Sequence, residues 1–177
     1  MAFAFPINSE EALKVQIADL RKRYHDARHH CFAWRLGADL KHYRVNDDGE
    51  PSGSAGKPIF GQIQSRELTD VLVVVIRYFG GTLLGVGGLI NAYRSATSNA
   101  FDRAQIIEMK VYNRLKLEFG YAHMNDVMKV IKDFHLEFEE QQFDLECVLT
   151  LNVWKRKEEQ VAKRLSGISG CKVKVLV

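Results

Sequence analysis

The stretch that decides the fold is Asp70-Val-Leu-Val-Val-Val-Ile-Arg-Tyr-Phe79, followed by Gly80-Gly-Thr-Leu-Leu-Gly-Val-Gly-Gly88. The run 71–76 is unbroken and mostly β-branched, which is typical of a strand buried on both faces. The glycines that follow concentrate backbone freedom at the end of this strand. Apolar residues then recur at helical spacing to about residue 103, at Leu89, Ala92, Tyr93, Ala96, Ala100 and Phe101. The stretch predicts a buried strand over 70–79, a glycine-rich turn and a helix.

The residues before this stretch predict further regular elements. Asn8-Ser-Glu-Glu11 has the pattern of a capping box, with Asn8 as the N-cap and Glu11 reaching back to it. A helix is predicted from there to about residue 24, on the apolar positions Leu13, Ile17, Leu20 and Tyr24. Residues 31–36 predict a strand with Phe32, Trp34 and Leu36 on one face.

A loop and a short helix are predicted between that strand and residue 70. Residues 46–57 are rich in Asp, Gly and Ser, a composition typical of a loop. Pro58 fits the first position of the helix, because proline has no amide hydrogen and that position needs none. The apolar positions of this helix are Ile59, Phe60, Ile63 and Leu68.

The pattern changes past Lys110, where the glycines become sparse and short elements follow one another. Strands are predicted over 115–119, from Leu136, over 143–153 and over 173–177, with a turn at Gln141-Gln142. Helices are predicted over 124–134 and 158–165. The order βαββαβ is that of a ferredoxin-like sandwich. We therefore predict an α+β protein of two domains, 1–109 and 110–177.

Composition excludes several classes of protein. The 177 residues carry 25 Lys+Arg and 22 Asp+Glu, a net charge of +3, well short of a dedicated nucleic-acid binder with a strongly cationic face. Cys31, Cys147 and Cys171 form no CxxC pair, so neither a disulfide framework nor a zinc ribbon is expected. The N-terminus lacks the basic start of a secretory signal, and no apolar run is long enough to cross a membrane. We expect a soluble cytoplasmic protein.

The glycine stretch comes near two nucleotide-binding motifs and matches neither. Ile90 stands at the last glycine position of GxGxxG, and Val86 and Gly87 stand where a P-loop has Lys and Ser or Thr. What survives is a strand-to-helix turn with free amides at the helix N-terminus. A tight, closely packed turn is favoured over a phosphate cradle, and both interpretations stay open.

The preceding loop carries three carboxylates, at Asp47, Asp48 and Glu50. Capping of turns and of the following helix is favoured over a hard-cation site, since the ligands lack the alternate spacing of an EF-hand loop. Ser52 and Ser54 on the same loop have no GxSxG context that would support a nucleophile.

His29-His-Cys31 is a weak candidate for half of a metal site. On a strand, His29 and Cys31 would share one face and His30 would not. No second ligand pair is evident apart from His42. We therefore predict no metal and no cofactor.

Four segments of the first half occur in a characteristic order. They are His29-His-Cys-Phe-Ala33, Asp47-Asp-Gly-Glu-Pro-Ser-Gly-Ser-Ala-Gly-Lys-Pro58, Arg77-Tyr-Phe-Gly-Gly81 and Leu84-Gly-Val-Gly-Gly-Leu-Ile-Asn-Ala-Tyr93. In sequence and order they closely resemble the IMPACT/YigZ family. The resemblance covers residues 5–107 as the family's N-terminal domain, and the second half is similar to the smaller C-terminal domain of bacterial members.

This resemblance implies a fold and a function. It implies an N-terminal α/β domain like the second domain of a small-subunit ribosomal protein, and a C-terminal domain like the late domains of elongation factor G. Eukaryotic relatives regulate translation by competing for the activator of a stress-responsive initiation-factor kinase, and the family supplies no established catalytic residues. The family pattern marks His29, Asp47, Asp48, Gly49, Glu50, Pro51, Gly53, Arg77, Gly80, Gly81, Gly85, Gly88 and Tyr93.

The sequence also departs from the family pattern. Leu83 stands where many relatives carry Lys, and Asn91 where they carry Arg or Lys. Losing both cations weakens a phosphate or RNA site beside the glycines. The chain begins at a residue that resembles the end of the family's opening strand, which fits either a truncated or a naturally shorter start.

Three functions compete on these residues. The first is a translation-associated regulatory binding protein that contacts RNA, the ribosome or a translation factor, with phosphate contacts from Arg77, Arg94, Lys57 and Arg44. The second is an enzyme acting on a small phosphorylated or anionic ligand between 47–58 and 80–88, with Asp48 or Glu50 as base or metal ligand and His29 as acid or base. The third is stabilisation alone, with Asp47 and Asp48 capping turns and Arg77 buried against Glu50.

We predict the first function, with the enzyme as the alternative. No membrane and no disulfide-linked partner is expected. The candidate ligand or partner surface comprises His29, Asp47, Asp48, Glu50, Ser52, Ser54, Lys57, Arg77, Gly80, Gly81, Gly85, Gly87, Gly88, Tyr93 and Arg94.

Overall fold

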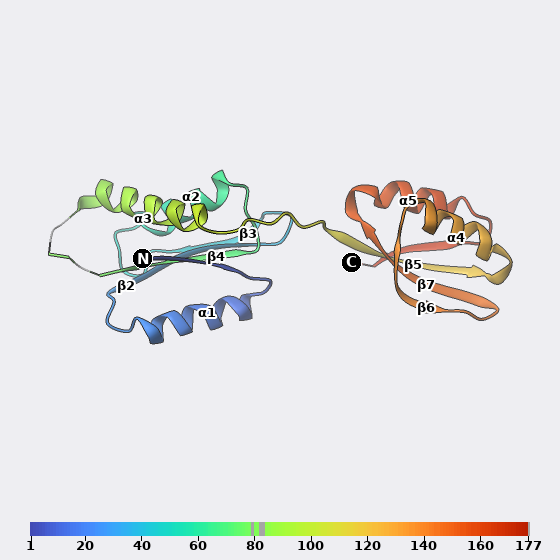
Figure 1. The fold of residues 1–177 in the computed structure, drawn as a ribbon, viewed down its shortest axis with the longest axis horizontal. Coiled ribbons are helices and arrows are strands. Elements are labelled where there is room, and N and C mark those ends of the chain that lie inside the picture. The colour runs from blue at the N-terminus through green and yellow to red at the C-terminus, as the bar shows by residue number, and fades with distance from the viewer. Residues whose placement is uncertain (79, 82–83, 177) are drawn as a thin grey trace. The chain divides into compact units, whose positions relative to one another are not determined.

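The computed structural model describes residues 1–78, 80–81 and 84–176 (Figure 1). The chain divides into two compact units, Met1–Ile107 and Glu108–Val177. Each unit holds one four-stranded sheet in which neighbouring strands are antiparallel. Two antiparallel sheets with five α-helices in the described residues confirm the predicted α+β class.

The first unit is built on a sheet of order β1-β4-β2-β3. Its strands are β1 (Ala2–Pro6), β2 (His29–Leu36), β3 (His42–Asn46) and β4 (Val71–Arg77). The two central strands are buried on both faces: every residue of β2 is buried, as are residues 72–76 of β4. This confirms the prediction that the β-branched run forms a strand covered on both sides.

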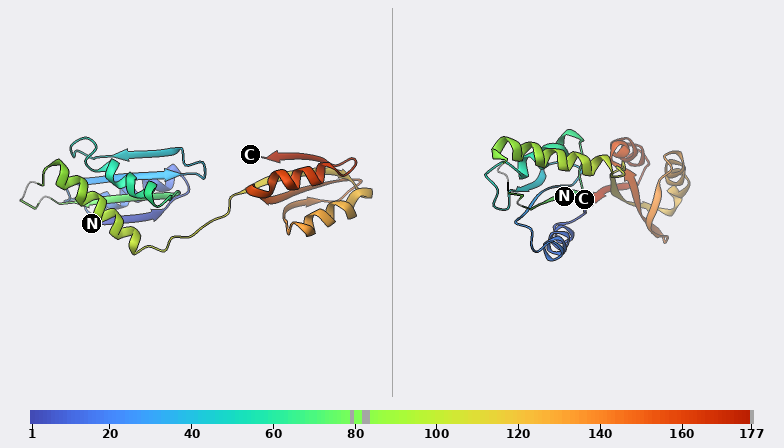
Figure 2. Two further views of the ribbon diagram at one scale, coloured as in Figure 1. Left: turned by 90° about the horizontal axis from the view of Figure 1, so that it is seen from above. Right: turned by 60° about the vertical axis from the view of Figure 1, so that its left-hand side comes forward.

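Helices cover both faces of this sheet (Figures 1 and 2). On one face, α1 (Glu10–Arg23) packs against Phe32, Trp34 and Leu36, which share a face as predicted. On the other, α2 (Gly56–Ser65) and α3 (Gly85–Asp102) pack against the alternate residues of the same strands. Because successive strand residues point to opposite faces, one sheet supplies two cores.

Three local predictions in this unit need correction. The N-cap of α1 is Ser9, whose side chain accepts the Ala12 amide at 3.2 Å, so the cap lies one residue later than predicted. The second helix begins at Gly56, which puts Pro58 at the third helical position. That position tolerates proline because the first four amides of a helix have no intrahelical partner. β4 ends at Arg77, and Phe79, the predicted last strand residue, lies outside the described residues.

The second unit has the predicted order of elements. It runs β5 (Tyr112–Gly120), α4 (Met124–Asp133), β6 (Glu137–Gln142), β7 (Glu146–Trp154), α5 (Glu158–Ser166) and β8 (Lys172–Leu176). Short 3₁₀ turns, Tyr121–His123 and Lys155–Lys157, precede the two helices. The order βαββαβ is the one on which the ferredoxin-like motif is defined.

Only one face of the second sheet carries helices. α4 and α5 lie on the same side of the sheet, whose strand order is β6-β7-β5-β8 (Figure 1). They cover a core made by alternate residues of β5 and β7, among them Leu115, Leu117, Leu149 and Leu151. The predicted turn at Gln141-Gln142 is wrong: both residues end β6, and the strand predicted from Phe143 begins at Glu146. Glutamine pairs in a ladder as readily as in a turn, so composition misplaced this boundary.

Candidate functional site

The site is organised by a tight turn between β3 and α2. The Glu50 amide donates to the Asp47 carbonyl at 2.9 Å, with Asp48 at φ +42° and Gly49 at φ +86° between them. Two successive left-handed residues define a type I′ turn, which glycine and aspartate tolerate better than other residues. The Asn46 side chain accepts the Asp48 amide at 2.7 Å and holds the turn at the end of β3. The turn sends its three carboxylates to three different sets of partners.

Asp47 accepts hydrogen bonds from the start of α2. Its Oδ1 accepts the amides of Ala55 and Gly56 at 3.0 and 2.7 Å, and its Oδ2 accepts the Gly53 amide at 2.8 Å. Burial opposes the charged carboxylate, but these three amides and the charge of Lys57 outweigh it and lower the pKa of Asp47. The N-cap residue, Ala55, has no side-chain acceptor, so the carboxylate caps the helix from a distance. The capping role favoured from the sequence is confirmed for Asp47.

Asp48 ties the turn to β2 and to α1. Its Oδ2 accepts the His30 amide at 2.6 Å, and its Oδ1 accepts the Arg21 guanidinium at 2.9 Å. The Asp48 carbonyl accepts the Nδ1–H of His29 at 2.8 Å. A carbonyl only accepts, so the hydrogen must sit on Nδ1 of this imidazole.

Glu50 is deeply buried, with a side chain 4% exposed against 25% for Asp48. Its Oε1 accepts Arg77 Nη1 at 3.1 Å and the Tyr93 hydroxyl at 2.8 Å, and His29 Nε2 lies 3.9 Å away. The β2–β4 register sets His29 opposite Arg77, so both side chains leave the sheet on the face that α3 covers. The contact between Arg77 and Glu50 that the stabilising interpretation predicts is therefore present.

Cys31 and Tyr93 join these carboxylates to the apolar core. The Cys31 sulfur lies 3.0 Å from the Asp47 carbonyl and 3.3 Å from the Tyr93 hydroxyl. Burial raises the pKa of Cys31 to about 12 and also raises that of Tyr93, so both groups are neutral at neutral pH. A thiol held in that form is a poor nucleophile. We name the turn cluster the set His29, Cys31, Asp47, Asp48, Glu50, Arg77 and Tyr93.

The glycines after β4 have a different environment. Gly80, Gly81, Gly85 and Gly87 are exposed, and among the described residues no side chain or distant backbone atom lies within 4 Å of the place a Cβ would occupy. Gly85 begins α3, so the exposed glycines lead into the amides at a helix N-terminus. Gly88 is the crowded one, because a Cβ there would lie 3.0 Å from Leu84 Cβ. The crowding at Gly88 fits a tight turn, whereas the space around Gly80, Gly81, Gly85 and Gly87 would allow a ligand to approach the backbone, as a phosphate cradle requires.

The remaining candidate residues are not part of the turn cluster. Lys57, Arg94 and Ser52 are exposed. Ser54 is fully buried, and its hydroxyl donates to the Pro51 carbonyl at 2.6 Å, which makes it a structural residue of the loop. Leu83, one of the two departures from the family pattern, lies outside the described residues.

Comparison with known proteins now identifies the family. A model of the Impact N-terminal domain matches residues 1–101, more than half of the chain. The chain belongs to the IMPACT family. An IMPACT family member of Haemophilus influenzae is 34% identical over 152 residues, 84% of this chain and 73% of that protein. The IMPACT family member YigZ of Escherichia coli is 45% identical over 92 residues, 51% of this chain and 45% of that protein.

A solved structure is similar over nearly the whole IMPACT-family chain. It is a crystal structure of a hypothetical protein, with a TM-score of 0.68 and 27% identity, and the match covers 99% of this chain and 86% of that one. The similarity therefore extends beyond the matched domain into the second unit. The match with the E. coli relative covers less than half of that protein's length.

In this IMPACT-family chain, two residues that the sequence does not single out contact the turn cluster from outside it. Arg21 on α1 and Asn46 at the end of β3 bind the turn, and Cys31 was considered only as a metal ligand. The period of two along the strand does put Cys31 beside His29, whereas no sequence signal links Arg21 to Asp48. Within residues 1–78, 80–81 and 84–176, no three His, Cys, Asp or Glu side chains converge as metal ligands.

Chemically, the turn cluster does two things. It fixes the loop against two strands and three helices, and it pairs its carboxylates with donors of the same unit. Both carboxylate oxygens of Asp47 and of Asp48, and Oε1 of Glu50, already accept from amides, Arg21, Arg77 and Tyr93. The arrangement is suited to holding a surface in shape rather than to proton transfer.

Proposed function

We propose that this protein is a translation-associated regulatory protein of the cytoplasm that acts by binding, with RNA on the ribosome as its partner and phosphates as the groups recognised. Family membership supports the regulatory role, because translational control is what the resemblance to the IMPACT/YigZ family implies. The binding surface comprises the exposed glycines Gly80, Gly81, Gly85 and Gly87 and the cations Arg94 and Lys57.

The observation that carries the proposal is the contrast between the two loops. The carboxylates of the 47–50 turn are paired, Asp47 and Glu50 with donors inside the unit and the 25% exposed Asp48 with Arg21, which weakens their repulsion of an anion at the surface. The glycines at the start of α3 face open space, where a phosphate could approach the backbone amides. A helix N-terminus carries a partial positive charge, which favours that approach.

The enzyme alternative has less support. Its proposed bases, Asp48 and Glu50, already accept from Arg21 and Arg77, and the Ser54 hydroxyl is buried. A general base must reach the proton it removes, and these carboxylates are committed elsewhere. A screen of nucleotides and phosphate esters with Asp48→Asn as control tests it: turnover lost in that variant would favour the enzyme.

Cosedimentation with bacterial ribosomes tests the binding function. The full chain is mixed with ribosomes and separated on sucrose gradients at low and at high salt. We expect the protein in the ribosomal fractions at low salt and a steep loss as salt rises, because phosphate contacts release counterions. A chain that stays at the top of both gradients contradicts the proposal. Binding that salt leaves unchanged indicates a protein partner instead of RNA.

One substitution separates recognition from folding. Gly87→Glu places a carboxylate in the first turn of α3 at a position with no neighbouring atom within 4 Å. Replacing a helical glycine and putting an anion at a helix N-terminus should stabilise the unit by about 1 kcal/mol. The same carboxylate should repel phosphates and reduce ribosome binding by about tenfold or more.

The control for this variant lies on the same helix. Arg103 is exposed at the C-terminal end of α3, and Arg103→Ala removes a cation far along the helix from the glycines. Arg94→Ala removes one nearer to them. We expect Arg94→Ala to weaken ribosome binding, because it removes one phosphate contact. Arg103→Ala should change the affinity by less than about twofold, because Arg103 makes no such contact. Equal losses in both would show that net charge alone is sensed.

A further inference from the structure

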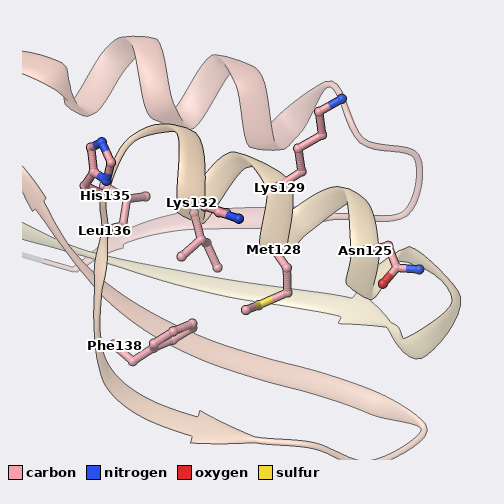
Figure 3. A pocket seen from close by; sticks show the side chains of 8 residues that line it. Asn125, Met128, Lys129, Lys132, His135, Leu136 and Phe138 are labelled. Carbon is pink, nitrogen blue, oxygen red and sulfur yellow. The ribbon is translucent and has the colours of Figure 1, made fainter.

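The second unit has a groove that the proposed function does not use. It is an open hollow of about 520 Å³ between α4 and β6. Met128, Ile131, Leu136 and Phe138 make its apolar surface, and Figure 3 shows Met128 and Phe138 reaching from the helix and the strand toward the space between them. Met128 and Phe138 are 37% and 39% exposed, so apolar surface is left uncovered there.

The wall of this groove is a sheet edge. β6 is an outer strand of the order β6-β7-β5-β8, and among the described residues it pairs with β7 alone. All six of its residues are exposed. An edge strand presents amides and carbonyls that only another extended backbone can pair in series. At ~3.4 Å per residue, β6 offers a template of about 20 Å.

The basic and the acidic side chains near this edge lie on opposite faces of the sheet. Lys129 and Lys132 of α4 line the groove, and so does His135, which follows the helix. The acidic residues of β6 lie on the other face of the sheet: Glu137 pairs with Asn152, and Glu139 bonds Arg114 at 2.6 Å. Asp133, at the end of α4, pairs with Arg164 of α5, away from the groove. The groove side therefore presents cations over an apolar floor.

We propose that this groove binds an extended acidic peptide segment of a partner protein, which adds as a strand to β6. Its backbone pairs with the free edge of β6, and every second side chain enters the groove, as alternation along a strand requires. An apolar side chain of the peptide lies against Met128 and Phe138. A neighbouring Asp or Glu lies near Lys129 or Lys132.

A peptide fits these features better than a nucleic acid does. Backbone amides and carbonyls in a row select a polypeptide, and the apolar floor holds one aromatic ring, Phe138, with the His135 imidazole on the wall beside it, too few rings for a run of stacked bases. The site lies in the second unit, whereas the proposed ribosomal surface lies in the first. Failure of either proposal therefore leaves the other standing.

Selection from a peptide library tests the proposal. A random library of peptides roughly twelve residues long, about twice the length of β6, is displayed on phage and panned against the full chain. We expect enriched sequences that alternate apolar with acidic residues. A synthetic copy of the most enriched peptide should shift the amide NMR signals of α4 and β6 and slow hydrogen exchange along β6. Enrichment of no sequence, or shifts confined to other elements, overturns the proposal.

Matched variants locate the binding and control for folding. Phe138→Asp, and separately Lys129→Glu with Lys132→Glu, should each weaken the synthetic peptide by about tenfold or more. Leu145→Asp changes an apolar residue that is 87% exposed in the β6–β7 turn, and Lys163→Glu reverses a charge on α5. Both should bind as the parent does, and all four should keep the parent's unfolding temperature. Losses equal in test and control variants contradict the proposal, as does displacement of the peptide by single-stranded oligouridine.

Discussion

The two units of this chain use charged residues in opposite ways. In Met1–Ile107 the sheet is covered on both faces, and the charges at the ends of β2 and β4 are folded inward onto the 47–50 turn. In Glu108–Val177 the sheet is covered on one face, and the alternate residues Arg114, Lys116 and Glu118 of β5 form ion pairs on the uncovered face. One unit uses charge to fix its shape, and the other keeps charge available at its surface.

A family pattern of polar residues therefore need not mark a contact surface. The residues that the resemblance singles out in the first unit are mostly internal: Asp47 caps a helix, and Glu50 neutralises Arg77. Their exposed counterparts are Gly80 and Gly81 after β4 and Gly85 at the start of α3. The family pattern therefore includes both the residues that hold the 47–50 turn and the exposed glycines that follow β4.

The largest expected effect comes from breaking the buried ion pair. The Arg77–Glu50 pair has side chains 19% and 4% exposed, and Arg114–Glu139 in the second unit has 46% and 36%. Glu50→Ala removes the carboxylate to which Arg77 and Tyr93 donate, and should lower the free energy of unfolding of the first unit by about 3 kcal/mol. Glu139→Ala should cost the second unit less than about 1 kcal/mol, because water screens an exposed pair.

The two tryptophans allow each unit to be measured separately. Trp34 is buried on β2 and Trp154 ends β7. Urea unfolding followed by fluorescence reports the first unit in a Trp154→Phe background and the second in a Trp34→Phe background. Equal losses from the two glutamate substitutions would refute the comparison, since burial would then not govern the strength of these pairs.

The second prediction concerns acid sensitivity, which should be stronger in the first unit. The folded state lowers the pKa of Asp47 below its ordinary value of 3.8, so the folded protein binds this proton less readily than the unfolded chain does. The resulting stabilisation is complete above the ordinary value and is lost as pH falls through the lower folded value. Asp47→Asn should cost about 2 kcal/mol at neutral pH, because one amide then faces a donor instead of an acceptor.

The same substitution should flatten the acid side of the stability curve. Urea unfolding of the first unit between neutral pH and about pH 2 measures this. Asp19→Asn is the control, since Asp19 is an exposed carboxylate paired with Arg23 on the surface of α1. The prediction fails if Asp47→Asn keeps the parent's slope below its ordinary pKa.

The elements of the fold could be read from the sequence where one signal dominated. Apolar runs and periodicity placed β4, α1 and α3 within a few residues, since burial of those faces is what stabilises the elements. β3 was missed because its residues His42 to Arg44 are exposed, and the strand exists through pairing with β2. Backbone pairing with another strand does not require alternating apolar residues, so the sequence of β3 lacks the pattern that predicts a strand.

The turn cluster could be predicted only in part. Capping by Asp47 follows from the residue type and the loop, as does the pairing of Arg77 with Glu50 once the family pattern brings their segments together. The Arg21–Asp48 contact depends on how α1 crosses the sheet, and the Cys31–Tyr93 contact depends on where α3 lies. These are properties of tertiary packing, which local sequence does not encode.

The smallest expected effects compare two glycines of one helix. A Cβ on Gly56 would lie 2.8 Å from the Asn46 backbone nitrogen, so the helix start must move away from the turn cluster to accept it. A Cβ on Gly61 would meet nothing within 4 Å. Gly56→Ala should destabilise the first unit by about 1–2 kcal/mol, as overpacking does. Gly61→Ala should stabilise it by about 0.5–1 kcal/mol, because alanine loses less backbone entropy in a helix. Opposite signs in urea unfolding of the Trp154→Phe protein would show that the close approach of α2 to β3 fixes the turn, whereas two stabilising substitutions would mean that the loop yields without cost.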